Sequence, residues 1–441
     1  MMRRTWLQRL PLLAAAFAPL LGPTATRAQV NAKVWLRVRN QSQEAFTHVW
    51  QGLPQQGTDV DLGPLLPRDE VSDAVLGKAH DLRTEAARLA GACQSGVSRE
   101  LAGLLRSMNS YYSNKIEGEH TRPLDIQRAL ASDFSENEDK ARLQRLALAH
   151  INTEAWIQDS PRPTAELYST AAVQEIHAHL FEQLEAKDRL VYVRDAQGNV
   201  IEQIETVPGA LRTRDVSVQR HVAPDYRCLD AMLTRWRDVY STTRRGEMQI
   251  VAAAAAHHRL AFIHPFQDGN GRAARLHTLA VLQSLELTTG LWSPLRGLAR
   301  SGERYSEKLA NADLARMGDG DGRGQRSERM LVEWIDFFLD VCLDQVQFMR
   351  KMLNLNAMQE RLSALLAHEE HMGKRGLRME ALRPLHYLFL TQGELTRGDF
   401  ASMTGLGDRT ATTLIGRLLA AGLLKSDTTR GQVRFGIPMD G

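Results

Sequence analysis

The stretch HPFQDGNGRAAR, from His264 to Arg275, brings together an imidazole, a carboxylate, an amide, two glycines and two guanidiniums. His264 follows an apolar helical segment and precedes Pro265, where that helix must end. We therefore expect its side chain to be presented rather than packed along a helix. A histidine that titrates near neutral pH is the usual general base for a hydroxyl nucleophile. Asp268 offers the oxygen ligands that Mg²⁺ prefers, and Phe266 is expected to anchor the loop in the core.

The second half of this stretch has the features of an anion site. Gly269, Asn270 and Gly271 open the next predicted helix, where glycines let backbone N–H groups face an anion at the positive helix end. Arg272 and Arg275 lie one helical turn apart, so both guanidiniums are expected to reach the opening of the same anion site. A base, a metal ligand, an anion-binding turn and two guanidiniums predict phosphoryl or nucleotidyl transfer to a hydroxyl.

A zinc site is the alternative that the histidines raise. His257 and His258 precede His264, but their spacing does not suit two ligands on one helix face. No cysteine or acidic ligand nearby completes the set. The residues favour magnesium with phosphate over zinc.

The elements that must position these residues are mostly helical. From about Asp69, apolar residues recur at three- and four-residue spacing, which predicts a helix through Leu76, Ala79, Leu82, Ala86 and Leu89. A second helix is expected to begin with Ser98 as its N-cap and to stop near Gly118. Residues 122–188 predict further helices. The β-branched and turn residues between 191 and 219 predict a short β-hairpin, or flap.

The last part of the chain forms a separate predicted unit. A helix at 380–391, a short second helix and a third with Asp408 as N-cap are followed by a hairpin. The third helix has an apolar stripe at Ala411, Leu414, Ile415, Leu418 and Leu419. This order predicts a winged helix-turn-helix domain over residues 376–441. Its eight basic and six acidic groups leave both DNA binding and protein dimerisation open.

Composition sets outer bounds. With 441 residues, 43% hydrophobic and 24% charged, the chain is expected to be globular with more than one domain. The net charge is +3, but residues 1–40 carry seven basic groups and no acid, so the remainder is slightly acidic. Bulk charge therefore gives no argument for nucleic acid. Three widely spaced cysteines, Cys93, Cys228 and Cys342, predict no disulfide framework.

The opening motif resembles the signature of the Fic (Fido) family of AMP-transferases, H-x-F-x-D/E-G-N-G-R-x-x-R, at every fixed position. The resemblance covers roughly residues 70–345. It implies a mainly α fold with a β-hairpin flap. It also implies a protein adenylyltransferase (AMPylator) that uses ATP and Mg²⁺ to modify a Ser, Thr or Tyr hydroxyl of a protein target. Gly271 favours AMP transfer, because the related Doc-type kinases carry a lysine there.

The resemblance also implies the residue roles. His264 would deprotonate the hydroxyl and Asp268 would hold the metal. Asn270 and the loop amides of Gly269 and Gly271 would bind the α- and β-phosphates, and Arg272 and Arg275 the β- and γ-phosphates. Tyr305 would lie near the adenine. The flap residues Val216, Ser217, Val218 and Gln219 would dock the target backbone by strand addition.

A second motif, SNKIEG from Ser113 to Gly118, is similar to the inhibitory [S/T]-x-x-x-E-[G/N] helix of Fic proteins. The resemblance implies that Glu117 pairs with Arg275 and occupies the guanidinium that the γ-phosphate needs, with Ser113 in the same motif. Because the same glutamate positions water in some relatives, removal of AMP stays open as a second activity. Without that context the motif is a helix end with a glycine C-cap.

These interpretations divide the chain into five parts: residues 1–28, a signal-like or mis-assigned segment; 29–125, with the inhibitory helix; 126–348, the catalytic domain; 349–375, a helical connector; and 376–441, the winged helix. The paired Arg3 and Arg4 and the apolar Leu10–Leu21 resemble an export signal. ATP as substrate nevertheless favours a cytoplasmic location, with export as the alternative. The competing function is a DNA-binding regulator. Self-modification and a homodimer are open, and no membrane association is expected.

Overall fold

The computed structural model describes residues 62–92, 95–194, 200–218, 221–244, 246–353, 355–372, 375–391 and 394–436. The signal-like segment at 1–28 lies outside these residues. The expected mainly helical fold with short hairpins is confirmed. None of the helices in the described ranges is long and apolar enough to cross a membrane. Of the described residues, 62–88 and 105–346 belong to one compact unit, and 89–104 with 347–436 to another.

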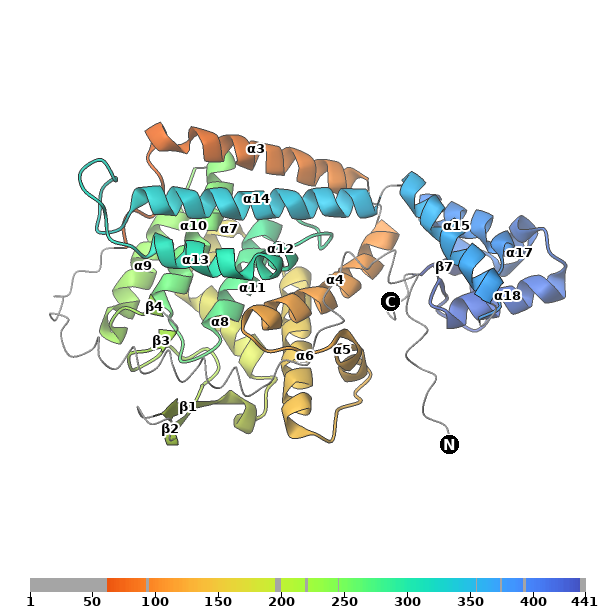
Figure 1. The fold of residues 1–441 in the computed structure, drawn as a ribbon, viewed down its shortest axis with the longest axis horizontal. Coiled ribbons are helices and arrows are strands. Elements are labelled where there is room, and N and C mark those ends of the chain that lie inside the picture. The colour runs from red at the N-terminus through yellow and green to blue at the C-terminus, as the bar shows by residue number, and fades with distance from the viewer. Residues whose placement is uncertain are drawn as a thin grey trace. The chain divides into compact units, whose positions relative to one another are not determined.

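The larger unit is built from helices with two small hairpins (Figure 1). Its helices are α3 (Asp69–Gly91), the second half of α4 (Ser95–Ile116), α5 (Pro123–Leu130), α6 (Glu138–Asp159), α7 (Thr164–Leu167), α8 (Thr170–Phe181), α9 (Leu229–Tyr240), α10 (Glu247–Ile263), α11 (Asn270–Ser284), α12 (Leu295–Arg300), α13 (Gly302–Ala312) and most of α14 (Glu328–Met352), with 3-10 turns η1 (Ala186–Arg189) and η2 (Tyr226–Cys228). Strands β1 (Leu190–Arg194) and β2 (Val200–Glu205) form one antiparallel pair, and β3 (Ser217–Val218) and β4 (His221–Val222) another. The prediction of a single β-hairpin in this region is therefore too simple, because the structure has two hairpins here.

Helix α10 is the centre of this unit. Its alanine run, residues 252–256, is buried throughout, and the helix packs against α9 and α11. Trp236 of α9 and Trp334 of α14 donate indole N–H bonds to the α10 carbonyls of Ala256 and Ala254, at 3.1 and 2.7 Å. On the outside, α3 runs along α14 (Figure 1), where Lys78 contacts two α14 aspartates. Small side chains let neighbouring helices hold α10 closely from several sides, so its C-terminal end is a rigid base for His264.

Helix α4 ends as the sequence predicted but begins earlier. It starts at Ser95, so the expectation that Ser98 is the N-cap is wrong. At its other end Gly118 adopts φ 78°, where its N–H donates to the carbonyl of Lys115 at 3.0 Å. The N–H of Glu119 donates to the carbonyl of Asn114 at 2.9 Å. These two hydrogen bonds form a Schellman cap, which reverses the chain within two residues. Glycine is favoured at Gly118 because the residue there has a left-handed backbone conformation.

The smaller unit contains α15 (Leu355–Met372), η3 (Met379–Ala381), α16 (Leu382–Thr391), α17 (Arg397–Thr404) and α18 (Asp408–Ala420), with strands β5 (Glu394–Leu395), β6 (Leu424–Lys425) and β7 (Val433–Phe435). The strands form one antiparallel sheet in the order β5-β7-β6, whose third strand the sequence did not predict. Gly407, not Asp408, is the N-cap of α18, so that expectation is wrong. The assignment as a winged helix, and its DNA-binding or dimerising role, stay predictions.

A buried carboxyl lies where α4 meets α6. Glu154 is almost fully buried, and Asn109 of α4 donates to its Oε1 at 2.7 Å. Burial raises the pKa of Glu154 to about 7, although the Asn109 bond and Arg106 oppose this. At neutral pH, folding therefore holds a carboxyl close to its titration midpoint inside the protein.

This burial predicts a pH dependence of stability. Because the folded pKa of Glu154 exceeds its unfolded value, its contribution is complete below about pH 4.5 and is lost as the pH rises through about 7. Glu154→Gln, which keeps an acceptor for Asn109, should remove this loss and gain about 1–3 kcal/mol over the natural chain at pH 8. Thermal unfolding of both proteins at pH 5 and pH 8 measures it. If the stability of the two proteins changed equally between pH 5 and pH 8, the raised pKa of Glu154 would be contradicted.

Candidate functional site

His264 is presented by the end of α10. It adopts the left-handed conformation (φ 53°, ψ 61°) and its N–H still bonds to the carbonyl of Leu260 at 3.1 Å. Its Nδ1 lies 3.3 Å from the carbonyl oxygen of Ala261, so Nδ1 carries the proton and Nε2 the lone pair. Burial, with help from the nearby His221, lowers the pKa of His264 to about 3. The imidazole is therefore neutral near pH 7, as a general base must be.

Two residues that the sequence did not single out hold this histidine in place. Arg212 is buried and donates from Nε to the carbonyl of His264 at 2.8 Å, while its own N–H donates to Pro265 O at 2.9 Å. His221, on β4, has its Nδ1 2.9 Å from Asp313 Oδ2 and its Nε2 2.9 Å from the carbonyl oxygen of Phe262. Its ring centroid lies 5.7 Å from that of His264. Neither stands in a recognisable motif, so only the fold reveals them.

The loop after His264 is shaped by side chain to backbone bonds. Asn270 Oδ1 accepts the N–H of Phe266 and its Nδ2 donates to the Phe266 carbonyl, both at 2.8 Å. Phe266 is buried as expected and stacks on His177, with ring centroids 3.8 Å apart. His177 Nε2 donates to the carbonyl of Asp268 at 3.0 Å. Asn270 Nδ2 carries a second hydrogen, so this amide and the backbone N–H groups of the first turn of α11 can donate to an anion.

Arg275 is buried beneath this turn and bound by the α4 end. Its Nε donates to Ser113 Oγ at 3.0 Å and its Nη2 to Ser113 O at 3.1 Å. Nη2 also lies 2.6 Å from Glu117 Oε1. The arginine side chain is 2% exposed and that of Glu117 is 32% exposed, so the carboxylate lies at the mouth. The structure thus contains the ion pair between the two motifs that the sequence predicted.

Arg272 is held by a different carboxylate. Its Nη1 lies 3.1 Å from Glu119 Oε2, and its Nη2 lies 4.0 Å from Asp268 Oδ2. Glu119 Oε1 in turn lies 2.9 Å from Arg142 Nη2 on α6. The sequence analysis missed Glu119, although its position two residues after Glu117 across a glycine was a readable signal.

Gly271 makes room for these contacts. A Cβ built on it would lie 2.3 Å from Glu117 Oε1. Burial would raise the pKa of Glu117, but the guanidiniums of Arg275 and Arg272 outweigh it and hold that pKa below its ordinary value. The carboxylate is therefore ionised at neutral pH and competes with any other anion for these arginines.

The remaining predicted site residues lie at different distances from this centre. Tyr305 is buried, with its hydroxyl 3.0 Å from His257 Nε2. Burial raises its pKa, and the nearby Arg275 opposes this rise. Among the flap residues, Ser217 and Val218 form β3, and the carbonyl of Val216 accepts the N–H of Ala223 at 3.2 Å. Gln219 lies outside the described residues.

A Mg²⁺ ion would fit the carboxylate of Asp268. Its side chain is 47% exposed at the end of the loop, and its closest cationic neighbour, Arg272 Nη2, is 4.0 Å away. A carboxylate with free lone pairs beside an anion-binding turn is the usual protein contribution to a Mg²⁺ bound by phosphates.

Of the two histidines in the zinc alternative, His257 Nδ1 lies 2.7 Å from Thr278 Oγ1 and His258 Nε2 lies 3.0 Å from Leu309 O.

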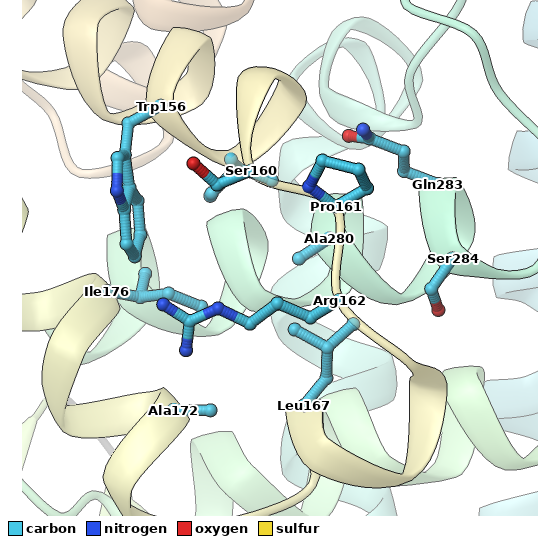
Figure 2. Close-up of a pocket in the computed structure, with 11 residues that line it drawn as sticks. Trp156, Ser160, Pro161, Arg162, Leu167, Ala172, Ile176, Ala280, Gln283 and Ser284 are labelled. Carbon is cyan, nitrogen blue, oxygen red and sulfur yellow. The ribbon is translucent and has the colours of Figure 1, made fainter.

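A separate small pocket lies at the opposite end of α11 (Figure 2). Arg162 extends across it toward Trp156, with the guanidinium 5.2 Å from the ring centroid. Ala280 and Ser284 of α11 line it, about 15 and 21 Å along the helix from Asn270. It is therefore not part of the site around His264.

The loop geometry predicts that Gly269 tolerates no side chain. It adopts φ 76°, and a Cβ would lie 2.3 Å from the Phe181 ring. Gly269→Ala should therefore destabilise the protein by about 1–3 kcal/mol, since buried aromatic and backbone must both shift. Gly302→Ala, with open space around its Cβ, is the matched control. Thermal unfolding measures both, and an equal effect of the two substitutions would contradict the packing described.

Comparison with known proteins bears on the same region. Residues 167–282 match the model of the Fic/DOC family. The protein adenylyltransferase Fic of Drosophila willistoni is 38% identical over 108 residues, which cover 24% of this chain and 21% of that protein. Its namesake from Nematostella vectensis is 38% identical over 76 residues, covering 17% and 18%. The chain thus spans about a fifth of the length of these curated relatives.

Solved structures are also similar. A Fic family protein from Desulfovibrio desulfuricans G20 matches 81% of this chain and 95% of its own, at 16% identity and a TM-score of 0.44. Fic-1 (residues 134–508) from C. elegans matches 66% of this chain and 74% of its own, at 19% identity and a TM-score of 0.44. The matched segment 167–282 contains the complete motif from His264 to Arg275. Through this segment, the chain is similar to proteins of the Fic/DOC family.

Proposed function

We propose that this chain transfers AMP from ATP to a Ser, Thr or Tyr hydroxyl of a protein target. The observation that carries the proposal is the arrangement around α11: a neutral His264 with a free Nε2, a helix N-terminus, and two guanidiniums one turn apart. Relatives named protein adenylyltransferase Fic support the same reaction class.

The chemistry follows from these groups. Nε2 of His264 takes the proton of the target hydroxyl, whose oxygen forms a bond to the α-phosphorus of ATP. The bond from that phosphorus to the bridging oxygen breaks, and pyrophosphate leaves with its electron pair. N–H groups at the start of α11 stabilise the phosphate oxygens, and Arg272 and Arg275 bind the outer phosphates. Asp268 would hold Mg²⁺, which neutralises phosphate charge when bound.

Glu117 restrains this reaction in the proposal. Its carboxylate occupies Arg275 at 2.6 Å, and Ser113 occupies two further donors of the same guanidinium. A γ-phosphate needs those donors, so ATP and Glu117 compete for one site. The exposed position of Glu117 also leaves it able to orient water, which supports removal of AMP as a second activity. The hairpin β3–β4 beside His264 would dock the target strand through Val216 to Gln219.

Relief of this restraint is testable. Glu117→Gly should raise transfer of labelled AMP, onto the chain itself and onto lysate proteins, by about tenfold or more, since charge-assisted bonds of about 1.5–3 kcal/mol become available to ATP. His264→Ala in the same background should reduce transfer by about 10²- to 10⁴-fold, the usual contribution of a general base. Intact-mass spectrometry of the purified chain measures both.

Glu136→Gly is the matched control, because this glutamate is exposed in a loop between α5 and α6. It should leave transfer unchanged. If Glu117→Gly behaved like this control while His264→Ala still abolished transfer, the restraint would be wrong and the enzyme assignment would stand. If the His264→Ala variant still transferred AMP, the proposed catalytic role of His264 would be refuted.

A further inference from the structure

We propose that Glu119 is a second restraining carboxylate, which withholds Arg272 from ATP as Glu117 withholds Arg275. The inference rests on the proposed function and specifies how the same site is regulated. Its basis is a pair of contacts that share one turn of the chain: Glu119 Oε2 to Arg272 Nη1 at 3.1 Å and Glu117 Oε1 to Arg275 Nη2 at 2.6 Å.

The helix cap explains why both carboxylates reach the site. Gly118, with φ 78°, reverses the chain between the two glutamates through its bond to Lys115 O. The N–H of Glu119 is fixed on Asn114 O at 2.9 Å. On the other side, Arg272 and Arg275 are separated by one turn of α11. One glycine turn therefore places two anions against two cations.

Burial makes the second contact consequential. The Arg272 side chain is 6% exposed and that of Glu119 is 22% exposed, so water screens this pair less than an open surface pair. Burial would lower the pKa of Arg272, but Glu119, Asp268 and Glu117 outweigh it and raise that pKa. Glu119 therefore occupies one of the two N–H donors of Arg272 Nη1. A phosphate oxygen can use that donor only if Glu119 moves away.

Arg142 is a second cationic partner for the Glu119 carboxylate. Its Nη2 lies 2.9 Å from Glu119 Oε1, so the carboxylate is shared between a cation on α6 and one on α11. When phosphate takes Arg272, Glu119 can stay on Arg142 without becoming an unpaired, half-buried anion. Arg142 should therefore favour the ATP-bound state, and it should do so only through Glu119.

The experiment measures MgATP affinity of the full chain by calorimetry for Glu119→Gln, Arg142→Met and the double variant. Glu119→Gln should tighten MgATP about threefold to tenfold, because a competing charge is removed. Arg142→Met should weaken it by a similar factor, because Glu119 then has Arg272 as its main partner. The double variant should match Glu119→Gln alone. Glu136→Gln, an exposed loop substitution, is the control and should change nothing.

The outcomes separate the alternatives. If Glu119 merely held Arg272 in place for ATP, Glu119→Gln would weaken MgATP, which overturns the proposal. A loss caused by Arg142→Met that persists in the double variant also overturns it, since Arg142 would then act independently of Glu119. Thermal unfolding of each variant confirms that the fold is retained. AMP transfer by the Glu117→Gly variant tests the proposed function separately. If Glu119→Gln binds MgATP more tightly but the Glu117→Gly variant transfers no AMP, the proposed function is refuted and the restraint by Glu119 stands. If no variant binds MgATP, both proposals are refuted.

Discussion

A buried guanidinium needs an anion, and in the proposed function the identity of the anion on Arg275 decides whether the site is restrained. Arg275 is enclosed at the first turn of α11, where Ser113 and Glu117 satisfy its donors. Removing a partner from such a buried charge without replacement is costly. In the proposed function, phosphates replace the α4 end on this arginine. This proposed exchange of anions would connect the helix cap, the loop and the base.

The scaffold keeps the other partners fixed so that this exchange can occur. Arg212 and His221 tie the His264 turn to the neighbouring chain, and Asn270 closes the loop on Phe266. Helix α10 is held by two tryptophan N–H bonds on its carbonyls. By contrast, Glu117 lies at the solvent-exposed end of its helix, where a cap of two backbone bonds ends α4. In the proposal, the fixed part of the site holds the reacting groups and the exposed Glu117 restrains them.

Sequence reasoning went furthest where local chemistry dictates structure. The end of α10 before Pro265 and the burial of Phe266 follow from proline sterics and a motif, as does the glycine end of α4. It failed where tertiary contacts decide. The N-caps at Ser98 and Asp408 were misplaced because several polar residues can cap a helix start. Arg212, His221 and Asp313 carry no local signal strong enough to mark them, since their partners lie far along the chain.

The competition for Arg275 is tested most directly by comparing the affinities of ATP and ADP for the natural chain and for Glu117→Gly. The γ-phosphate is the group that Glu117 is proposed to exclude, and ADP lacks it. Glu117→Gly should therefore tighten ATP substantially and leave ADP nearly unchanged. Equal tightening of both nucleotides, or of neither, would contradict the account, because Glu117 would then not be competing with the γ-phosphate for this arginine.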